Sequence, residues 1–213
     1  MSIEVSPRKT PKQSRALFTV DAILQAAARI LVEVGYDKLN TNEVARRAGV
    51  SVGSLYQYFP NKQSLLAELH FRHATQTSAP IFSALRNSQG KPLRKVIQQI
   101  IQAHVASHSE EPMLHKVISE ECHKLPLRPW QLEMDREAVH LVKNFLLEHQ
   151  NELQIESLEL TIYLLTQIVE TCIHSAVAMA PKALKNGSLA RELERMLYLY
   201  LTVDENTQEK MSH

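Results

Sequence analysis

The segment Thr41–Lys62, TNEVARRAGVSVGSLYQYFPNK, constrains the fold of this 213-residue chain more than any other stretch. Thr41 is placed to cap a short first helix, because its hydroxyl can accept from the N–H groups of the opening turn. Gly49 can adopt the left-handed conformation that ends a helix, and Ser51 is placed to cap the next one. The segment therefore predicts a helix, a tight turn and a second helix. The apolar face of the first helix would be made by Val44, Ala45 and Ala48.

The second helix has an unusual outer face. At about 100° per residue its apolar residues fall on one side. These are Ala48, Val52, Leu55 and Phe59, whereas the opposite side has Gly53 and Gln57, flanked by Ser54, Tyr56 and Tyr58. A glycine inside an exposed helix costs roughly 1 kcal/mol relative to alanine, so Gly53 suggests that another backbone, such as that of DNA, approaches there. An ordinary helical hairpin with a tolerated glycine is the alternative.

Lys62 follows Asn61, which is placed to cap a third helix. An ammonium group and free backbone N–H groups would then lie together, and this combination binds anions such as phosphate.

The run EVARRAGVSVGSLYQYFPNKQSLL resembles the DNA-binding domain of the TetR family of bacterial transcriptional regulators. The pattern of that family is roughly I/V-A-x-x-A-G-V-S-x-G-x-L-Y-x-Y/H-F-x-x-K-x-x-L, and every fixed position is filled here. The resemblance extends from about Thr19 to Leu69, and the rest of the chain resembles the family only in size and helical character.

The resemblance implies roles for individual residues. Phosphates would be held by Thr41, Tyr58, Lys62 and a basic N-terminal arm, which position the protein without reading sequence. Base edges would be met by Gln57, Ser54 and Tyr56, with Val52 against a thymine methyl and Gly53 allowing close approach.

Composition agrees with a soluble globular protein, since 44% of residues are hydrophobic and 22% are charged. Five glycines and few strand patterns favour an all-α fold. No apolar run approaches the ~18 residues of a membrane span, and the start, MSIEVSPRKTPKQSR, lacks the apolar core of a signal peptide. We therefore expect a cytoplasmic protein with no membrane partner. Cys122 and Cys172 are expected to be buried small apolar groups rather than a disulfide framework.

The net charge of +1 hides an asymmetry. Residues 1–73 contain ten lysines and arginines against six acids, whereas the remainder contains fourteen against seventeen. Released counterions make nucleic-acid binding depend on local charge, so the basic part suits the helix-turn-helix. Within it, residues 1–17 are predicted to form a flexible basic arm that follows a phosphate strand or enters the minor groove. A merely solvated tail is the equal alternative.

Apolar periodicity predicts about nine helices. The first follows Thr19 as a cap and ends at Gly35, and a long one runs from Asn61 toward Pro80. Further helices are expected at 92–109, 113–123, 129–151, 157–180 and 188–203, with a break at Pro181–Gly187. The expected domains are the arm (1–17), the helix-turn-helix domain (18–64), a helical effector-binding and dimerisation domain (65–204) and a disordered tail (205–213).

The last two predicted helices are apolar over more than one face, too much for a helix on a monomer's surface. The resemblance implies that they pair across a two-fold axis as a four-helix bundle, which suits the paired half-sites of helix-turn-helix proteins. The homodimer interface would contain Leu164, Ile168, Ser175, Met179, Leu193, Leu197 and Tyr200. A larger monomeric core is the alternative.

The resemblance also implies an effector pocket among the middle helices. Its candidates are polar residues in apolar surroundings: His104, His108, Trp130, Gln167, Glu170, Thr171 and His174. Glu170 and His174 are four residues apart on one helix face, so they can pair or meet a ligand. A buried Glu170 would favour a cationic or hydrogen-bonding effector, and a surface pair at the edge of the bundle is the alternative.

His104 and His108 also have the spacing of metal ligands on a helix, with Glu120, Cys122 and His123 as further donors. Nothing in the sequence brings these residues together, so no metal or other cofactor is predicted. Adjacent residues on a helix point about 100° apart, so Cys122 and His123 suit a nucleophile and base poorly. No catalytic site is predicted.

The sequence thus predicts an all-α, dimeric repressor that binds a palindromic operator in double-stranded DNA and is released by a small-molecule effector. A helical ligand-sequestering or enzymatic protein that keeps the helix-turn-helix as scaffold is one alternative, and it predicts no salt-dependent DNA binding. A regulator of the same family that acts as an activator is the other.

Overall fold

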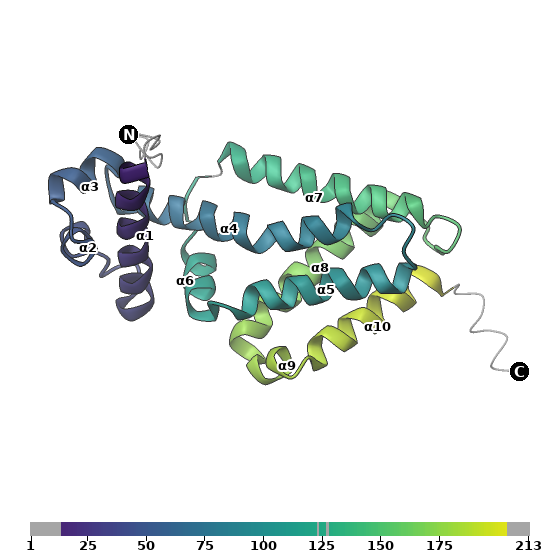
Figure 1. Ribbon diagram of the computed structural model, residues 1–213. Coiled ribbons are helices and arrows are strands. Elements are labelled where there is room, and N and C mark those ends of the chain that lie inside the picture. The colour runs from purple at the N-terminus through teal and green to yellow at the C-terminus, as the bar shows by residue number, and fades with distance from the viewer. Residues whose placement is uncertain (1–13, 123, 127, 204–213) are drawn as a thin grey trace, which may run out of the picture. The chain divides into compact units, whose positions relative to one another are not determined.

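The computed structural model describes residues 14–122, 124–126 and 128–203, and within those ranges the regular structure is ten α-helices without a strand (Figure 1). The helices are α1 (Ser14–Val34), α2 (Thr41–Ala48), α3 (Val52–Tyr58), α4 (Lys62–Arg86), α5 (Leu93–Ser109), α6 (Pro112–Cys122), α7 (Pro129–Glu148), α8 (Leu158–Met179), α9 (Pro181–Lys185) and α10 (Ser188–Thr202). The predicted all-α class is confirmed. The predicted tail over 205–213 and most of the arm lie outside the described residues.

The chain divides into two compact units, and the division differs from the predicted boundary at 64/65. The first unit contains the described residues of 1–75 and 111–127, and the second contains those of 76–110 and 128–213. The helix α4 continues across position 75 without a break. The helix α6 belongs to the first unit because Leu114, Ile118 and Cys122 join its hydrophobic core.

The core of the first unit forms around α1. Its buried face consists of Val20, Ile23, Leu24, Ala26, Ala27, Ile30 and Leu31. Against this face pack Leu55 of α3, Phe59 directly after it, and Leu65 and Leu66 of α4. These side chains recur at three- and four-residue steps, as the sequence predicted, so α1 is the support on which the helix-turn-helix rests.

The start of α1 was predicted too late. The helix includes residues 14–17, which were assigned to the arm, because no proline or glycine interrupts the chain there. Thr19 lies inside the helix, where its hydroxyl donates to the carbonyl of Arg15 at 2.9 Å instead of capping the N-terminus.

The second unit packs α5, α7, α8 and α10 around one core (Figure 1). Leu93, Val96, Ile97 and Ile101 of α5 meet Leu165, Val169 and Ile173 of α8 and Leu193, Leu197 and Leu201 of α10. The five helices predicted between 92 and 203 are all present, with ends within a few residues of the expected ones.

Two predictions about helix breaks were wrong. The helix α4 passes through Pro80 and ends at Arg86, and Leu85 in its last turn is buried in the core of the second unit. The segment Pro181–Lys185 forms the short helix α9, because proline suits the first helical position and Leu184 is buried in the core.

The helix α8 also corrects the statement that no apolar run approaches the length of a membrane span. By length and composition alone, α8 is a candidate span, and 28% of its most apolar window is buried. It carries Glu159, Glu170 and His174, and one face packs in the core of the second unit. A core helix of a soluble protein passes the same length and composition test.

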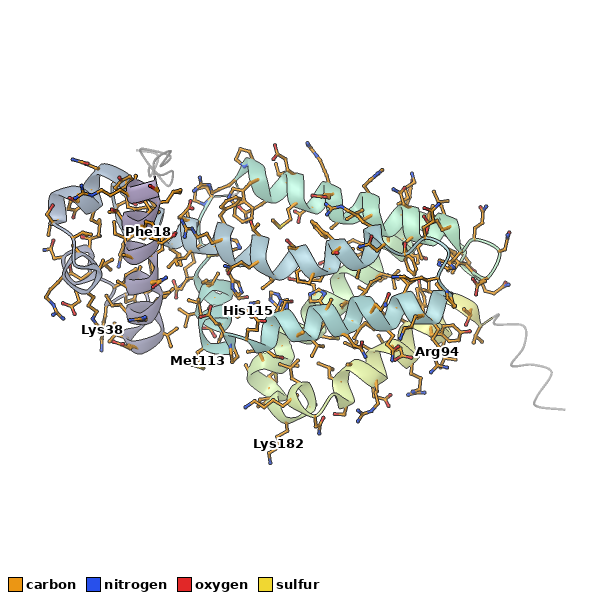
Figure 2. The ribbon with its side chains drawn as sticks, in the orientation of Figure 1. Phe18, Lys38, Arg94, Met113, His115 and Lys182 are labelled. Carbon is orange, nitrogen blue, oxygen red and sulfur yellow. The ribbon has the colours of Figure 1, made fainter. Side chains whose placement is uncertain are left out.

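Truncation of Phe59 tests whether the α1 core holds the helix-turn-helix. Phe59 is 1% exposed, so Phe59→Ala is expected to lower the free energy of unfolding by about 3–5 kcal/mol. Phe18 on α1 is 76% exposed, so Phe18→Ala is the matched control and should change it by no more than about 0.5 kcal/mol (Figure 2). Urea unfolding followed by circular dichroism measures both, and equal losses would contradict the packing described here.

Candidate DNA-binding surface and effector site

The helix α2 is capped by Asn40, not by Thr41 as the sequence predicted. The Asn40 side chain accepts a hydrogen bond from the backbone N–H of Asn42 at 2.8 Å, and Thr41 is the first helical residue. The Thr41 hydroxyl is instead 3.0 Å from the hydroxyl of Tyr56 on α3. Both groups are predicted DNA contacts, so the structure brings two predicted site residues together.

The turn between α2 and α3 agrees with the prediction. Gly49 has a φ of 68° in the left-handed region, and its N–H closes the last turn of α2. The Ser51 side chain accepts from the N–H of Ser54 at 3.0 Å and caps α3. Both conformations follow from local preferences, which is why the sequence indicates them correctly.

The helix α3 has only seven residues, and its inner side is fixed by Leu55. The predicted base-contacting residues Gly53, Tyr56 and Gln57 are exposed, and Ser54 and Tyr58 are partly buried. Val52 was placed on the core side by the helical wheel, but it is 40% exposed because it lies in the first turn, ahead of the buried Leu55.

Gly53 has an ordinary helical conformation and ample space around it. A Cβ atom added there would come no closer than 3.9 Å to another group of the protein, the Ser51 hydroxyl. Neither backbone conformation nor packing within the described residues therefore requires glycine at this position.

Lys62 has partners within the first unit. Its ammonium group donates to the carbonyl oxygens of Tyr36 and Asp37, both at 3.3 Å, and lies 4.5 Å from the centroid of the Tyr36 ring. Asn61 caps α4 as predicted, accepting from the N–H of Ser64 at 2.8 Å. Lys62 thus ties α4 to the loop after α1, which the sequence did not indicate.

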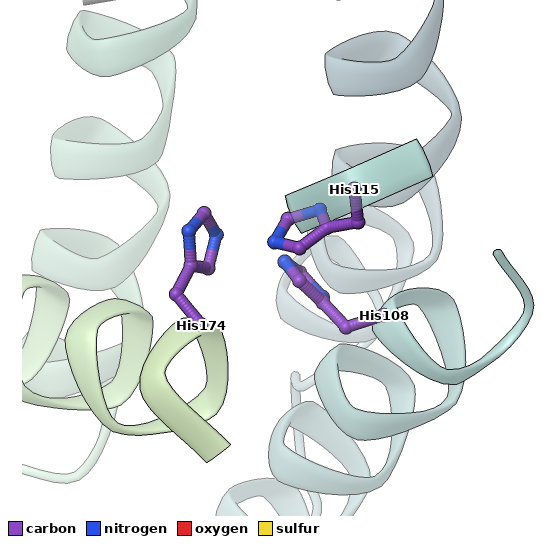
Figure 3. A group of neighbouring side chains, drawn as sticks. All are labelled: His108, His115 and His174. Carbon is purple, nitrogen blue, oxygen red and sulfur yellow. The ribbon is translucent and has the colours of Figure 1, made fainter. Parts of the chain in front are cut away.

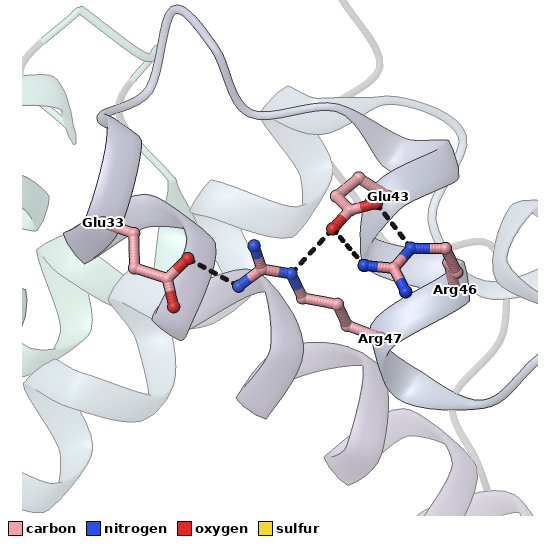
Figure 4. A network of polar contacts seen from close by, with 4 residues as sticks. All are labelled: Glu33, Glu43, Arg46 and Arg47. Atoms are coloured by element: carbon pink, nitrogen blue, oxygen red, sulfur yellow. Dashed lines mark hydrogen bonds and ion pairs between the residues drawn. The ribbon is translucent and has the colours of Figure 1, made fainter.

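A network of charged side chains joins α1 and α2 (Figure 4). Glu43 accepts from Arg46 at 2.7 and 2.8 Å and from Arg47 at 2.8 Å, and Arg47 also reaches Glu33 at 2.6 Å. Hydrogen bonds from Arg46 and Arg47 lower the pKa of Glu43 to about 2. Glu43 therefore stays ionised at neutral pH and offsets part of the positive charge on α2.

Four of the predicted effector residues meet in the second unit. The Glu170 carboxylate on α8 bridges two imidazoles: Oε2 is 2.9 Å from His104 Nε2 on α5, and Oε1 is 2.6 Å from His174 Nε2. His108 lies one turn after His104 and is buried. Figure 3 shows the rings of His108 and His174, whose centroids are 4.9 Å apart.

The electrostatics of this cluster favour a charged carboxylate. Burial raises the pKa of Glu170, but the hydrogen bonds from His104 and His174 outweigh burial, so the pKa lies well below its usual range. The Glu170 side chain is 52% exposed, which limits the opposing effect of burial. Burial, helped by repulsion from His104, lowers the pKa of His108 to about 4, so this imidazole is neutral at neutral pH.

The other three predicted effector residues lie on α7 and α8. Gln167 and Thr171 are exposed on α8, and in the described part of the chain no hydrogen bond joins them to the cluster. Trp130 is partly buried in the first turn of α7.

A cavity of about 630 Å³ lies between α5, α9 and α10 of the second unit. Its lining includes Ile101, Val105, Leu184, Gln98, Arg191 and Glu194, and none of the seven predicted effector residues. The sequence missed this cavity because α9 was predicted as a break between helices.

The residues proposed as further metal donors are not the ones that the structure supplies to His104 and His108. Glu120 and Cys122 lie on α6 in the first unit, and His123 lies outside the described residues. Cys122 is buried as expected, and burial raises the pKa of its thiol to about 12, so the thiol is protonated at neutral pH.

Comparison with known proteins identifies both units. Residues 23–69 match the bacterial regulatory proteins of the tetR family, and residues 92–201 match the tetracyclin repressor-like C-terminal domain. The chain belongs to the TetR family. This family consists of DNA-binding transcriptional regulators, and the helix-turn-helix described above is its DNA-binding part.

Individual relatives match this TetR-family chain over different extents. The A-factor receptor protein of Streptomyces griseus is 33% identical over 86 residues, which cover 40% of this chain and 29% of that protein. The uncharacterized regulator YvdT of Bacillus subtilis is 30% identical over 79 residues, covering 37% of this chain and 40% of YvdT. The chain therefore matches well under half the length of these two curated relatives.

Among solved structures, SmeT, the repressor of the Stenotrophomonas maltophilia multidrug efflux pump SmeDEF, has a TM-score of 0.66 at 18% identity. The comparison covers 88% of this chain and 94% of SmeT. It shows the TetR fold and carries no residue-level detail.

The predicted dimer residues of this TetR-family chain fall into two groups. Leu193 and Leu197 are buried in the core of their own unit and leave little surface for a second chain. Leu164 and Ile168 are partly buried on α8, and Ser175, Met179 and Tyr200 are exposed. The Tyr200 hydroxyl lies 3.4 Å from the Thr161 hydroxyl, so α8 and α10 are neighbours there.

Two alanine variants distinguish the observed cap of α2 from the predicted one. Asn40→Ala removes the acceptor of the Asn42 N–H, so it is expected to lower the free energy of unfolding by about 1 kcal/mol. Thr41→Ala is the neighbouring control and loses only a contact with the exposed Tyr56 hydroxyl, with an expected change within about 0.5 kcal/mol. Chemical denaturation measures both, and a larger loss for Thr41→Ala would restore the original assignment.

Proposed function

We propose that this protein is a cytoplasmic TetR-type repressor that binds a palindromic operator as a homodimer and is released by a small-molecule effector. The observation that carries the DNA-binding mode is the outer face of α3, where Gly53, Tyr56 and Gln57 are exposed while Leu55 on the inner side is buried in the core. SmeT, which has the same fold, is a repressor, and this supports repression rather than activation.

The division of labour on the DNA follows from exposure and chemistry. The exposed amide of Gln57 can donate and accept at a base edge, and the exposed Val52 offers an apolar contact for a thymine methyl. The hydroxyls of Thr41 and Tyr56 lie 3.0 Å apart and form one hydrogen bond, so the hydroxyl that accepts in this pair keeps its own O–H to donate to a phosphate oxygen beside it. Ser54 and Tyr58 complete the proposed surface.

Lys62 would contribute to DNA binding partly by holding the start of α4 against the loop after α1. Because its ammonium group holds the loop carbonyls of Tyr36 and Asp37, it fixes the entrance of α4 and places a positive charge beside the free N–H groups of that helix. Its removal is expected to lower affinity for every DNA sequence, since a phosphate contact carries no sequence information.

Gly53→Ala separates DNA binding from folding. A Cβ at this position meets no group of the protein closer than 3.9 Å, and alanine is favoured over glycine within a helix by up to about 1 kcal/mol. The variant should be at least as stable as the natural protein but bind operator DNA at least tenfold more weakly, because the added methyl blocks close approach of the DNA. Fluorescence anisotropy with DNA flanking the gene, at two salt concentrations, measures the affinity.

Gly49→Ala is the matched control, because Gly49 has a φ of 68° and alanine is strained there. It should lose stability by about 1 kcal/mol, the reverse of Gly53→Ala. Unchanged DNA affinity of Gly53→Ala would contradict the proposed binding face.

The dimer is proposed from the apolar surface that α8 and α10 leave exposed in a single chain. Leu160, Tyr163 and Met179 of α8 are 55%, 60% and 82% exposed, and Met196, Leu199 and Tyr200 of α10 are exposed as well. If a second chain covered this surface, the hydrophobic effect would stabilise the dimer by about 25 cal/mol for each Å² of apolar surface buried. A two-fold dimer also suits the paired half-sites of a palindrome.

A double variant tests this interface. Leu160→Glu with Met179→Glu places two charges on side chains that are exposed in the single chain, so the fold should persist while the dimer dissociates. Val139→Glu, on the exposed side of α7, is the control and should remain dimeric. Sedimentation velocity measures the mass of each, and a double variant that stays dimeric would remove α8 from the proposed interface.

The effector site is proposed in the second unit, where two features compete. The cluster of Glu170 with His104 and His174 presents a carboxylate and imidazoles, whereas the cavity between α5, α9 and α10 presents apolar walls with polar groups at its edge. One relative is named the A-factor receptor protein, which supports the binding of a signal by this chain.

A further inference from the structure

Two facing helices of the second unit each contribute a pair of residues four positions apart. The helix α5 supplies His104 and His108, and α8 supplies Glu170 and His174. Residues at this spacing share one face of a helix, so the four side chains converge from both sides. Glu170 contacts one imidazole from each helix, at 2.9 Å and 2.6 Å.

A contact with the backbone of His104 fixes the tautomer of His108. Its Nδ1 lies 2.8 Å from the backbone carbonyl oxygen of His104, so Nδ1 carries the hydrogen and donates it. The Nε2 atom is then the unprotonated nitrogen of the ring. A metal-binding histidine is oriented in this way in proteins, by a carbonyl that holds the other ring nitrogen.

The separations match a small cation. One ligand atom from each of His104, His108 and Glu170 can be chosen so that all lie within 4.8 Å of one another. With ligand bonds of about 2.0–2.1 Å, neighbouring ligand atoms in a tetrahedral zinc site are about 3.3 Å apart. An ion would therefore draw His108 inward and spread the Glu170 contacts by less than 1 Å, within the reach of side-chain rotation.

We propose that His104, His108, Glu170 and His174 bind a divalent transition metal ion of the Zn²⁺ class. Imidazole and carboxylate suit such ions, whereas Mg²⁺ and Ca²⁺ prefer oxygen ligands. The half-exposed Glu170 gives the ion a path from solvent, and the buried His104 and His108 form the floor of the site. As a signal for DNA release, the ion deepens the proposed function and rests on it.

Metal binding is tested on the full chain without DNA. Isothermal titration of Zn²⁺ into metal-free protein, with Co²⁺ absorption spectra as a second readout, should give one ion per chain. Glu170→Gln keeps the size of a half-exposed side chain, and it should weaken binding at least tenfold, as should His174→Ala. Circular dichroism verifies that each variant is folded.

His140→Ala is the control, because His140 is an exposed histidine on α7 whose ring contacts Asn144. It should bind as the natural protein does. The metal site would be overturned if the natural protein did not bind Zn²⁺, or if Glu170→Gln and His174→Ala bound it as tightly as the natural protein. Either result would leave a hydrogen-bonded cluster only.

A separate titration with operator DNA, with and without Zn²⁺, distinguishes this inference from the proposed function. Absence of specific DNA binding in both states would contradict the repressor while the metal site stands. Equal DNA affinity in both states would overturn the ion's role as the effector.

Discussion

The burial of Leu55 and Phe59 against α1 is the constraint on which the proposed DNA-binding face of α3 depends. A helix of seven residues is unstable alone, because the cost of its first turn is not recovered over so short a length. The helix α3 exists because Ser51 caps it and because these two side chains are removed from water. Leu55 and Phe59 hold the inner side, whereas Gly53 and Gln57 on the outer side are exposed, and packing within the described residues does not require a larger side chain at position 53.

The second unit solves a different problem, that of polar groups at a helix interface. A carboxylate beside buried rings has a high desolvation cost unless it is hydrogen-bonded, and Glu170 meets this condition twice. The cluster joins α5 to α8 at one point along an otherwise apolar contact. A polar point of this kind is sensitive to any ligand that replaces its hydrogen bonds, which an apolar contact is not.

Features set by neighbouring residues were predictable from the sequence, and features set by distant ones were not. Gly49, Ser51 and Asn61 act within four residues of themselves and were identified correctly. Thr41 was misassigned as the cap because Asn40, directly before it, is an equally suitable cap residue, and the actual partner of the Thr41 hydroxyl, Tyr56, is fifteen positions away. Periodicity showed that Leu193 and Leu197 are covered, but it did not reveal that their own chain covers them. His104 and Glu170 are 66 positions apart, so only the fold brings them together.

The binding free energy of a metal ion is large enough for the cluster of Glu170 with its histidines to act as the effector site. To move a two-state equilibrium from 1:99 to 99:1, a ligand must bind one form about 10⁴-fold more tightly, which is roughly 5.5 kcal/mol. Structural zinc sites reach apparent binding free energies of about 10–16 kcal/mol, so a fraction of that difference between the two forms would suffice. The helix α4 links the units as one continuous element, from Lys62 to Arg86. A change that an ion imposes on the second unit therefore has a covalent route to the helix-turn-helix, provided that the two forms differ in affinity for the ion.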